Sequence, residues 1–316
     1  MPHDSESMLP RIWYSPAYDL EWDGHVFPAG KYRATRDRLL ADGVIAAADL
    51  GKSELLDRGS LLCGHTVDYL DRLEAMTATP QLGYYEFEAP CSRRVLDGFY
   101  AMAGGTLAAC RAALERTEPG CVGFAANLGG GFHHAFPWKG EGFCAINDIV
   151  VAIRVLLTEG AIERAAVVDL DVHQGNGTAK AFEDEERVFT MSMHQQNNYP
   201  VKQRSDLDVG LPDKCEDARY LDELARALPV VQEAQPDLVL YVAGADPFHR
   251  DQLGGLSLTL DGMAGRDARV YEAFLGGGVP VVGTLAGGYS ADEKDVVEIH
   301  YRMVREGLEA SAAIGR

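Results

Sequence analysis

The sequence is poor in cysteine, and its cysteines show no pairing pattern. Six occur in 316 residues, with no CxxC pair and no repeated spacing. Such scattered cysteines favour free thiols in a reducing compartment over a disulfide framework. The first residues lack a basic segment followed by an apolar one, so we expect no signal peptide. No apolar run approaches the roughly 20 residues of a membrane span. We therefore expect a soluble, cytoplasmic protein with no membrane span.

Positive charge is also scarce. The chain has 29 Lys+Arg against 48 Asp+Glu, a formal net charge of −19. A surface of this sign repels nucleic-acid phosphates and attracts cationic partners such as lysine-rich segments or polyamines. We expect no nucleic-acid partner. The charge does not indicate an oligomeric state.

The sequence has no internal repeat, low-complexity tract or linker-like segment, so we expect one domain over residues 1–316. Short apolar runs alternate with segments of helical period. The runs predict strands at 121–127, 165–171, 187–193, 237–244 and 279–288. The helical patterns cover 97–116, 145–160, 216–233, 261–275 and 292–309, and the second stops at Gly160. This alternation predicts an α/β fold, a three-layer α/β/α sandwich with a mainly parallel sheet. Its functional site should lie beyond the carboxyl ends of the strands.

Ionisable residues cluster at the end of the apolar run 165–171. Asp169, Asp171 and His173 are spaced two residues apart, so in an extended strand they share one face. Buried without partners, these groups would cost several kcal/mol, which favours a bound cation over a chance loop. An EF-hand is excluded, because its glycine and glutamate positions are Gln174 and Lys180 here.

Three further segments follow predicted strands. Asp246, after the strand 237–244, would complete a set of two carboxylates and one imidazole, the composition of a catalytic zinc site with an open position. His133 and His134 follow three glycines, and histidine is suited to moving a proton at neutral pH. Tyr289 follows two glycines after the last predicted strand, where its phenol could stabilise an oxyanion.

The order of these motifs resembles that of the zinc-dependent histone deacetylases of the arginase/deacetylase superfamily. The motifs are "GGGFHHA", "GEGFCAIND", "DLDVHQGNGT", "AGADPFHRDQLGGLSLT" and "AGGYS", and the likeness extends from about Trp13 to about residue 300. The residues of "GGGFHH", "DVHQGNG" and "EFEAPCSRRVL" look most like those of the class IV branch and its bacterial relatives. The resemblance implies the arginase/deacetylase fold.

The resemblance also implies roles for individual residues. Asp171, His173 and Asp246 would bind one Zn²⁺, and His134 of the histidine pair would be the proton shuttle. Tyr289 would hydrogen-bond the oxyanion.

Other implied roles lie around this centre. Asp169 would orient His133 and help to hold a structural potassium ion with backbone oxygens near Asp171, His173 and Ser192. A second, peripheral cation would lie near Phe182 and Val188. Gly142 and Phe143 would line a narrow tunnel for the lysine side chain, with Tyr199 facing Phe143.

Two positions depart from the family pattern. Asn176 stands where some members have an aspartate that orients the second histidine, and an amide cannot raise imidazole basicity as a carboxylate does. Tyr199 stands where many members have phenylalanine, which leaves the acyl preference open.

The expected function is therefore zinc-dependent hydrolysis of an amide, removing acetyl or longer acyl groups from the ε-amine of lysine in a protein or peptide. An acetylpolyamine amidohydrolase is the alternative with the same chemistry. A two-manganese ureohydrolase would need more carboxylates, because positions 175 and 248 are Gly and Phe. A catalytically silent acyl-lysine binding module is disfavoured, because every expected ligand and Tyr289 are present.

Overall fold

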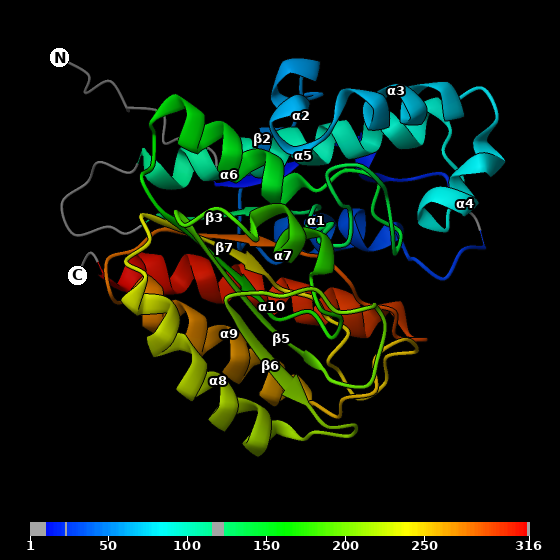
Figure 1. Cartoon of the computed structure of the whole chain (residues 1–316). Helices are drawn as coiled ribbons and strands as arrows, with labels where there is room; N and C mark the ends of the chain where they lie inside the picture. The colour runs from blue at the N-terminus through cyan, green and yellow to red at the C-terminus, as the bar shows by residue number, and fades with distance from the viewer. Residues whose placement is uncertain (1–10, 23, 116–122, 315–316) are drawn as a thin grey trace, which may run out of the picture.

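One parallel β-sheet forms the centre of the computed structural model, which describes residues 11–22, 24–115 and 123–314 (Figure 1). Within these residues the sheet has eight strands in the order β2-β1-β3-β8-β7-β4-β5-β6. Every neighbouring pair runs parallel, so the mainly parallel sheet expected from the sequence is confirmed. The strands are β1 Ile12–Tyr14, β2 Leu50–Lys52, β3 Phe124–Asn127, β4 Ala165–Asp169, β5 Val188–Gln195, β6 Leu207–Leu211, β7 Leu238–Val242 and β8 Val281–Thr284.

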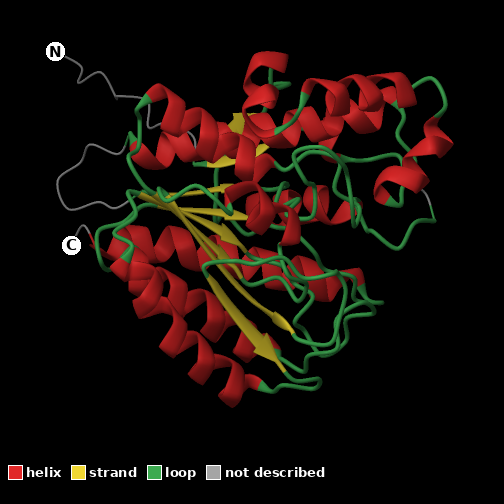
Figure 2. Cartoon of the chain, in the orientation of Figure 1, coloured by secondary structure: helices red, strands yellow, loops and turns green. Residues whose placement is uncertain are grey.

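Helices cover both faces of the sheet and complete the three layers (Figure 2). Helix α5 packs on β1, β3 and β8 and also contacts α6, which in turn contacts α2. On the other face α8, α9 and α10 pack side by side, and α1 packs against α10. The helices are α1 Gly30–Ala41, α2 Arg58–Gly64, α3 Val67–Met76, α4 Gly83–Phe87, α5 Arg93–Leu114, α6 Asp148–Glu159, α7 Asn176–Phe182, α8 Asp217–Glu233, α9 Leu260–Phe274 and α10 Glu293–Ile314.

The apolar runs become strands because the helices bury both of their faces. Every residue of β3, β4, β7 and β8 is buried, as near-continuous apolar strands in a parallel sheet require. The five predicted strands are all present, although residues 121 and 122 of the first lie outside the described residues. The sequence patterns missed β1, β2 and β6. The first two have three residues each, and β6 is an edge strand that is partly exposed along its length.

Helix α6 illustrates how local sequence sets the boundaries of an element. Its amino end is capped by Asn147, whose side chain accepts a hydrogen bond from Val150 N, and Gly160 ends it in the left-handed region at φ 68°. The five predicted helices correspond to α5, α6, α8, α9 and α10. Helices α1 to α4 and α7 were not predicted.

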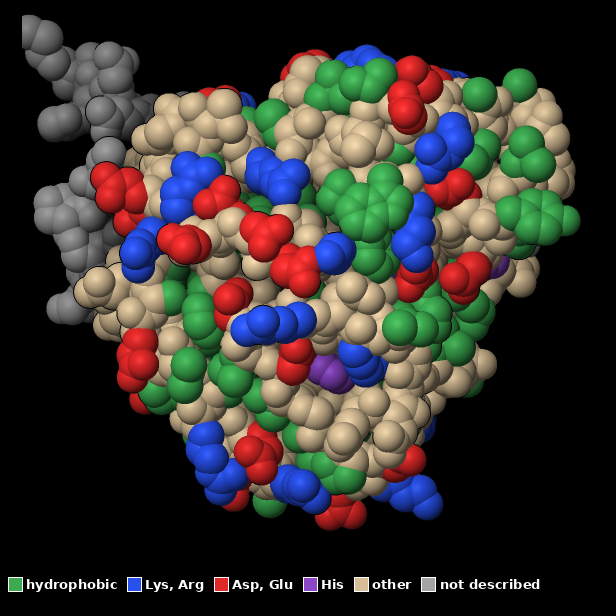
Figure 3. Space-filling model, in the orientation of Figure 1, with side chains coloured by type: hydrophobic (Ala, Val, Ile, Leu, Met, Phe, Trp, Pro, Cys, Tyr) green, Lys and Arg blue, Asp and Glu red, His purple; other side chains and the backbone are tan. Residues whose placement is uncertain are grey.

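The surface carries both signs of charge. On the face seen in Figure 3, Asp and Glu side chains are interspersed with Lys and Arg. Among the helices of the described ranges, none is long and apolar enough to cross a membrane.

The sheet brings the predicted site residues to one edge. Strands β3, β8, β7 and β4 are successive neighbours, and because they are parallel their carboxyl ends point the same way. The segments after these four strands carry the histidine pair, Tyr289, Asp246 and the Asp171–His173 segment, respectively.

Candidate active site

Asp171, His173 and Asp246 meet in a buried cluster that could hold a metal ion. One ligand atom from each lies within 4.8 Å of the others. His173 Nδ1 is 3.1 Å from Asp171 Oδ1 and 3.3 Å from Asp246 Oδ2. Among the described residues this is the one group of three or more His, Cys, Asp or Glu side chains with such geometry.

The route by which these residues converge differs from the sequence prediction. Strand β4 ends at Asp169, so Asp171 and His173 do not share a strand face with it. The chain instead bends after Asp169, and Asp169 Oδ1 accepts a hydrogen bond from Asp171 N at 3.2 Å. The Asp169 side chain turns toward His133, whereas Asp171 and His173 turn toward Asp246. The expectation of three groups on one strand face was wrong.

The cluster has the properties of a cation site. Asp246 Oδ2 is buried and accepts no hydrogen bond, and a Cβ at Gly287 would clash with it and would lie 2.5 Å from Asp171 Oδ2. Glycine at 287 therefore lets the backbone approach both carboxylates. Burial, reinforced by the Asp171 charge, raises the pKa of Asp246 to about 7. Two carboxylates and one imidazole fit a zinc ion that keeps one coordination position open. The positive charge of such an ion would offset the unfavourable burial of the two carboxylates.

The histidine pair lies beside the cluster and has a separate partner for each ring. His133 Nδ1 is 2.7 Å from Asp169 Oδ2, and His134 Nδ1 is 2.8 Å from Asn176 Oδ1. The two Nε2 atoms are 3.1 Å apart.

These environments push the two pKa values apart. Burial alone would lower the pKa of His133, but the carboxylates of Asp169 and Asp171 outweigh it and raise the pKa to about 9. Burial lowers the pKa of His134 well below its usual value, and the charges of His133 and His173 add to the effect. The lowered pKa favours the neutral form of His134, which is the form of the imidazole that can accept a proton.

Tyr289 closes the site from the β8 side. Its ring contacts Phe27 and Phe143, with centroids 6.0 and 6.1 Å away. Burial raises the pKa of its phenol well above 10, and the charges of Asp171 and Asp246 raise it further. The hydroxyl therefore keeps its proton and can donate it in a hydrogen bond.

A narrow cavity leads from the surface to these groups. Its outer part, of about 190 Å³, is lined by His134, His173 and Tyr289 together with Gly142, Phe143, Tyr199, Glu88, Asn198 and Leu253. A smaller inner space of about 20 Å³ reaches Asp171 and Gly287. The predicted tunnel residues Gly142, Phe143 and Tyr199 line this one cavity. The Tyr199 ring also lies beside the rings of His134 and His173, with centroids 5.3 and 6.0 Å away.

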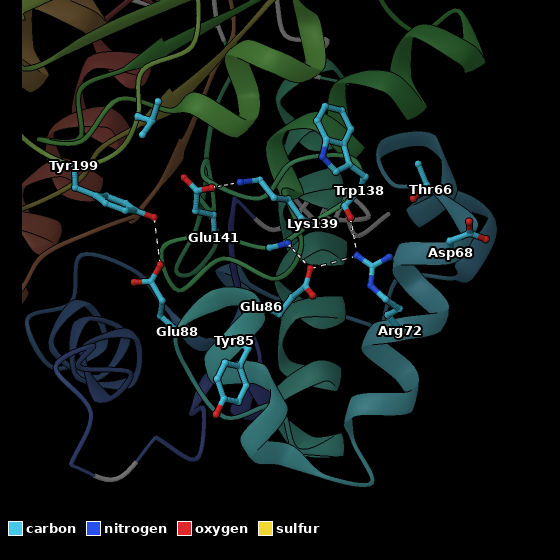
Figure 4. A pocket seen from close by; sticks show the side chains of 12 residues that line it. Thr66, Asp68, Arg72, Tyr85, Glu86, Glu88, Trp138, Lys139, Glu141 and Tyr199 are labelled. Atoms are coloured by element: carbon cyan, nitrogen blue, oxygen red, sulfur yellow. Dashed lines mark hydrogen bonds and ion pairs between the residues drawn. The ribbon is translucent and has the colours of Figure 1, made fainter.

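A hollow of about 950 Å³ adjoins the mouth of this cavity and shares Glu88 and Tyr199 with it (Figure 4). Tyr199 Oη lies 3.4 Å from Glu88 Oε1 where the two spaces meet. Glu141 and Lys139, which form an ion pair, also face the hollow.

Comparison with known proteins identifies the family. The family model for the histone deacetylase domain matches residues 25–303, which is most of the chain. The chain belongs to the histone deacetylase family. Histone deacetylase 2 of Arabidopsis thaliana is 31% identical over 315 residues, covering 94% of this chain and 79% of the relative. An uncharacterized protein of Picosynechococcus sp. is 41% identical over 278 residues, covering 87% of this chain and 90% of the relative.

Solved structures of histone deacetylase homologues share the fold. The homologue from Aquifex aeolicus has a TM-score of 0.77 at 26% identity, with 96% of this chain and 84% of that one covered. As a member of this family the chain is a hydrolase, and its buried Asp171, His173 and Asp246 are consistent with the catalytic zinc site of the family.

The sequence patterns missed several residues that shape the candidate active site. Asp148 accepts hydrogen bonds from Gly131 N and Phe132 N and so anchors the glycine segment before the histidines. Lys31 is fully buried and donates to Ala286 O at 2.6 Å. The motif "GEGFCAIND" contained Asp148 and could have drawn attention to it, whereas no local pattern marks Lys31.

Proposed function

We propose that this member of the histone deacetylase family removes acyl groups from the ε-amine of lysine side chains. The observation that carries the proposal is the narrow cavity that ends at His134, Tyr289 and the metal-site residue His173. Its walls include an aromatic ring, Phe143, and a glycine, Gly142, which leave a slender space suited to an unbranched alkyl chain. A peptide backbone is too bulky to follow, so the substrate would present its acyl amide on a long side chain.

Each residue has a definite part in this reaction. A zinc ion held by Asp171, His173 and Asp246 would polarise the acyl carbonyl and make a water molecule acidic enough to attack near neutral pH. His134, neutral and facing the cavity, takes the proton from the attacking water and later protonates the departing amine. Tyr289 donates a hydrogen bond to the oxygen on which negative charge develops.

Acetylpolyamine hydrolysis is the second candidate. The mouth of the cavity carries Glu88, whose carboxylate would attract a secondary ammonium of a polyamine, and the net charge of −19 favours cationic substrates of either kind. A panel of acetyl-, butyryl-, octanoyl- and myristoyl-lysine peptides, assayed beside acetylspermidine, discriminates the two. A kcat/KM for acetylspermidine that exceeds that of every peptide would overturn the lysine assignment.

A matched pair of variants tests the shared chemistry. Tyr289→Phe should lower kcat by about 10²–10³, because the oxyanion loses one donor. Tyr271→Phe is the control, since its hydroxyl donates to Met303 O in the core at 2.8 Å, away from the cavity. Equal turnover in the two variants would contradict the assigned part of Tyr289.

The finer expectations from the sequence are also part of this proposal. A structural potassium ion near Asp169 and Ser192 is supported by their pairing in register across β4 and β5. Membership of the class IV branch is supported by the motifs "GGGFHH" and "DVHQGNG". A single domain is supported by a sheet whose strands span residues 12–284, and a cytoplasmic location by the unpaired cysteine pattern.

A further inference from the structure

The amide of Asn176 lies between His134 and a carboxylate from another part of the chain. Asn176 Oδ1 is 2.8 Å from His134 Nδ1, and Asn176 Nδ2 donates to Glu141 Oε1 at 2.7 Å. The second carboxylate oxygen of Glu141 is paired with the ammonium of Lys139 at the wall of the hollow (Figure 4). Four side chains therefore form one continuous line from the surface to the histidine pair.

The direction of every hydrogen bond in this line follows from Glu141. An amide can present either its oxygen or its NH₂ group to a neighbour, so Asn176 alone does not select a histidine tautomer. A carboxylate can only accept, and therefore the NH₂ group must face Glu141 and the oxygen must face His134. His134 Nδ1 must then carry the hydrogen, which leaves the lone pair on Nε2.

The opposite orientation would have the opposite result. If the NH₂ group of Asn176 faced His134, then Nδ1 would have to be the acceptor and the hydrogen would move to Nε2. Such a ring could not take a proton at Nε2, the atom that meets His133 Nε2 at 3.1 Å beside the cavity. The orientation of the Asn176 amide therefore decides whether His134 can act as a base.

We propose that Glu141 is a positioning residue that orients the Asn176 amide and thereby holds His134 as the Nδ1–H tautomer. The inference rests on the proposed function in one respect, namely that His134 serves as the base. Some family members have an aspartate at the Asn176 position. In this chain the carboxylate is that of Glu141, and it acts on His134 through the Asn176 amide.

The backbone keeps Glu141 in place. Glu141 N donates to Cys144 O at 3.2 Å and Cys144 N donates to Glu141 O at 2.9 Å, which closes a tight turn. Gly142 and Phe143 at its tip have φ values of 53° and 65°. The residue that selects the tautomer and two residues that line the cavity thus belong to one hydrogen-bonded turn.

Exchanging the amide and the carboxylate tests the proposal. In Glu141→Gln, the new amide oxygen should face the Lys139 ammonium and its NH₂ group should face Asn176, which reverses the line and moves the hydrogen to His134 Nε2. In the double variant Glu141→Gln/Asn176→Asp, the carboxylate introduced at position 176 accepts from both His134 Nδ1 and the amide introduced at position 141, so the original direction returns. Glu86→Gln is the control, because Glu86 lines the same hollow but accepts from Gly140 N instead.

Two readouts distinguish positioning from a general structural role. The ¹⁵N chemical shifts of His134 in histidine-labelled protein should report Nε2–H in Glu141→Gln and Nδ1–H in wild type, Glu86→Gln and the double variant. On an acyl-lysine peptide, kcat should fall about 10–10²-fold in Glu141→Gln at nearly unchanged KM, and recover to within about 3-fold in the double variant.

The outcomes separate this proposal from the proposed function. An unchanged His134 tautomer in Glu141→Gln, or a double variant that folds and binds zinc but keeps the reversed tautomer, would overturn it. The expected shifts without turnover of any acyl-lysine peptide would leave the positioning role supported and reject the lysine substrate. If Glu141→Gln does not fold, Glu141→Ala is the second variant: without the carboxylate the Asn176 amide can take either orientation, so His134 should show both tautomers, and a pure Nδ1–H form would overturn the proposal.

Discussion

Arg266 on α9 is a fully buried guanidinium behind the candidate metal site. Its Nη1 donates to Gly244 O at 2.5 Å and lies 3.5 Å from Leu170 O, and its Nε donates to Asp267 Oδ1 at 2.9 Å. Gly244 precedes Asp246 by two residues, and Leu170 directly precedes another ligand candidate. One side chain therefore joins the two segments that supply all three candidate ligands.

Arg266→Met should lower the free energy of unfolding by about 3–5 kcal/mol, because it leaves the Asp267 carboxylate buried without its cation. The double variant Arg266→Met/Asp267→Val should recover most of this loss, since an apolar pair often replaces a buried ion pair at little cost. About 2 kcal/mol should remain lost, because the Tyr241 hydroxyl no longer has Asp267 to donate to and the buried Gly244 carbonyl no longer has the Arg266 donor.

Zinc affinity should behave differently from stability. Both variants lose the donor that holds the Gly244 and Leu170 carbonyls, so both should bind zinc about 10–10²-fold more weakly, as is usual when an outer partner of a metal site is removed. Denaturant unfolding of the metal-free protein measures the first quantity, and competition with a chelator measures the second. Arg269→Met is the matched control, because Arg269 donates to Gly265 O within α9.

Two results would refute this reasoning. One is an Arg266→Met variant whose free energy of unfolding, measured without metal, lies within about 1 kcal/mol of wild type. A buried carboxylate left without its cation should destabilise the fold by more than this. The other is a double variant with wild-type zinc affinity, which would mean that the guanidinium does not hold the ligand segments in place.

Three further predictions concern the cavity, the metal and pH. Gly142→Ala should reduce kcat/KM about 10²-fold, because a Cβ there would lie 2.6 Å from His134 Cδ2 at a φ of 53°; steady-state kinetics checks this, and wild-type activity would contradict it. Chelation of the metal should lower the free energy of unfolding, by about 4 kcal/mol relative to protein in zinc at a thousandfold excess over Kd; urea midpoints that do not depend on zinc would argue against a site at His173. Burial lowers the pKa of Lys31 to about 8, against the opposing charges of Asp246 and Asp171, while the unfolded lysine titrates near 10.5. Since the unfolded state then binds more protons between these values, stability should rise by about 1.4 kcal/mol per pH unit from pH 8 to 10.5, and urea unfolding of Lys31→Met should lack that rise; an identical rise in this variant would exclude Lys31 as its source.

The central strands could be predicted because their residues are apolar on both faces. In β4 the run is apolar up to Asp169, and β7 is apolar throughout. Such runs predict strands of a parallel sheet that are buried on both faces. The polar residues after such runs then had to gather at one edge, which is where the structure has Asp246 and the histidine pair. In contrast, β1 and β2 have three residues each and pair only with partners distant in the chain, so no local period marks them.

The convergence of Asp171 and His173 could not be obtained from strand geometry, because the chain leaves the strand at Asp169. The partners of buried polar groups were equally inaccessible. Glu141 and Asn176 are 35 residues apart, and Arg266 reaches Leu170 across 96 residues. Nothing in the local pattern at either end of these contacts indicates the other end.

The sequence by itself determined the chemical groups available, the strands that carry them and the family they belong to, because residue type and apolar period are local properties. Tertiary structure decided which donor meets which acceptor: that Glu141 faces the Asn176 amide, and that one guanidinium joins the Gly244 and Leu170 carbonyls. Hydrogen-bond direction depends on distance and orientation between groups remote in the chain, so it exists only once the sheet and helices have packed.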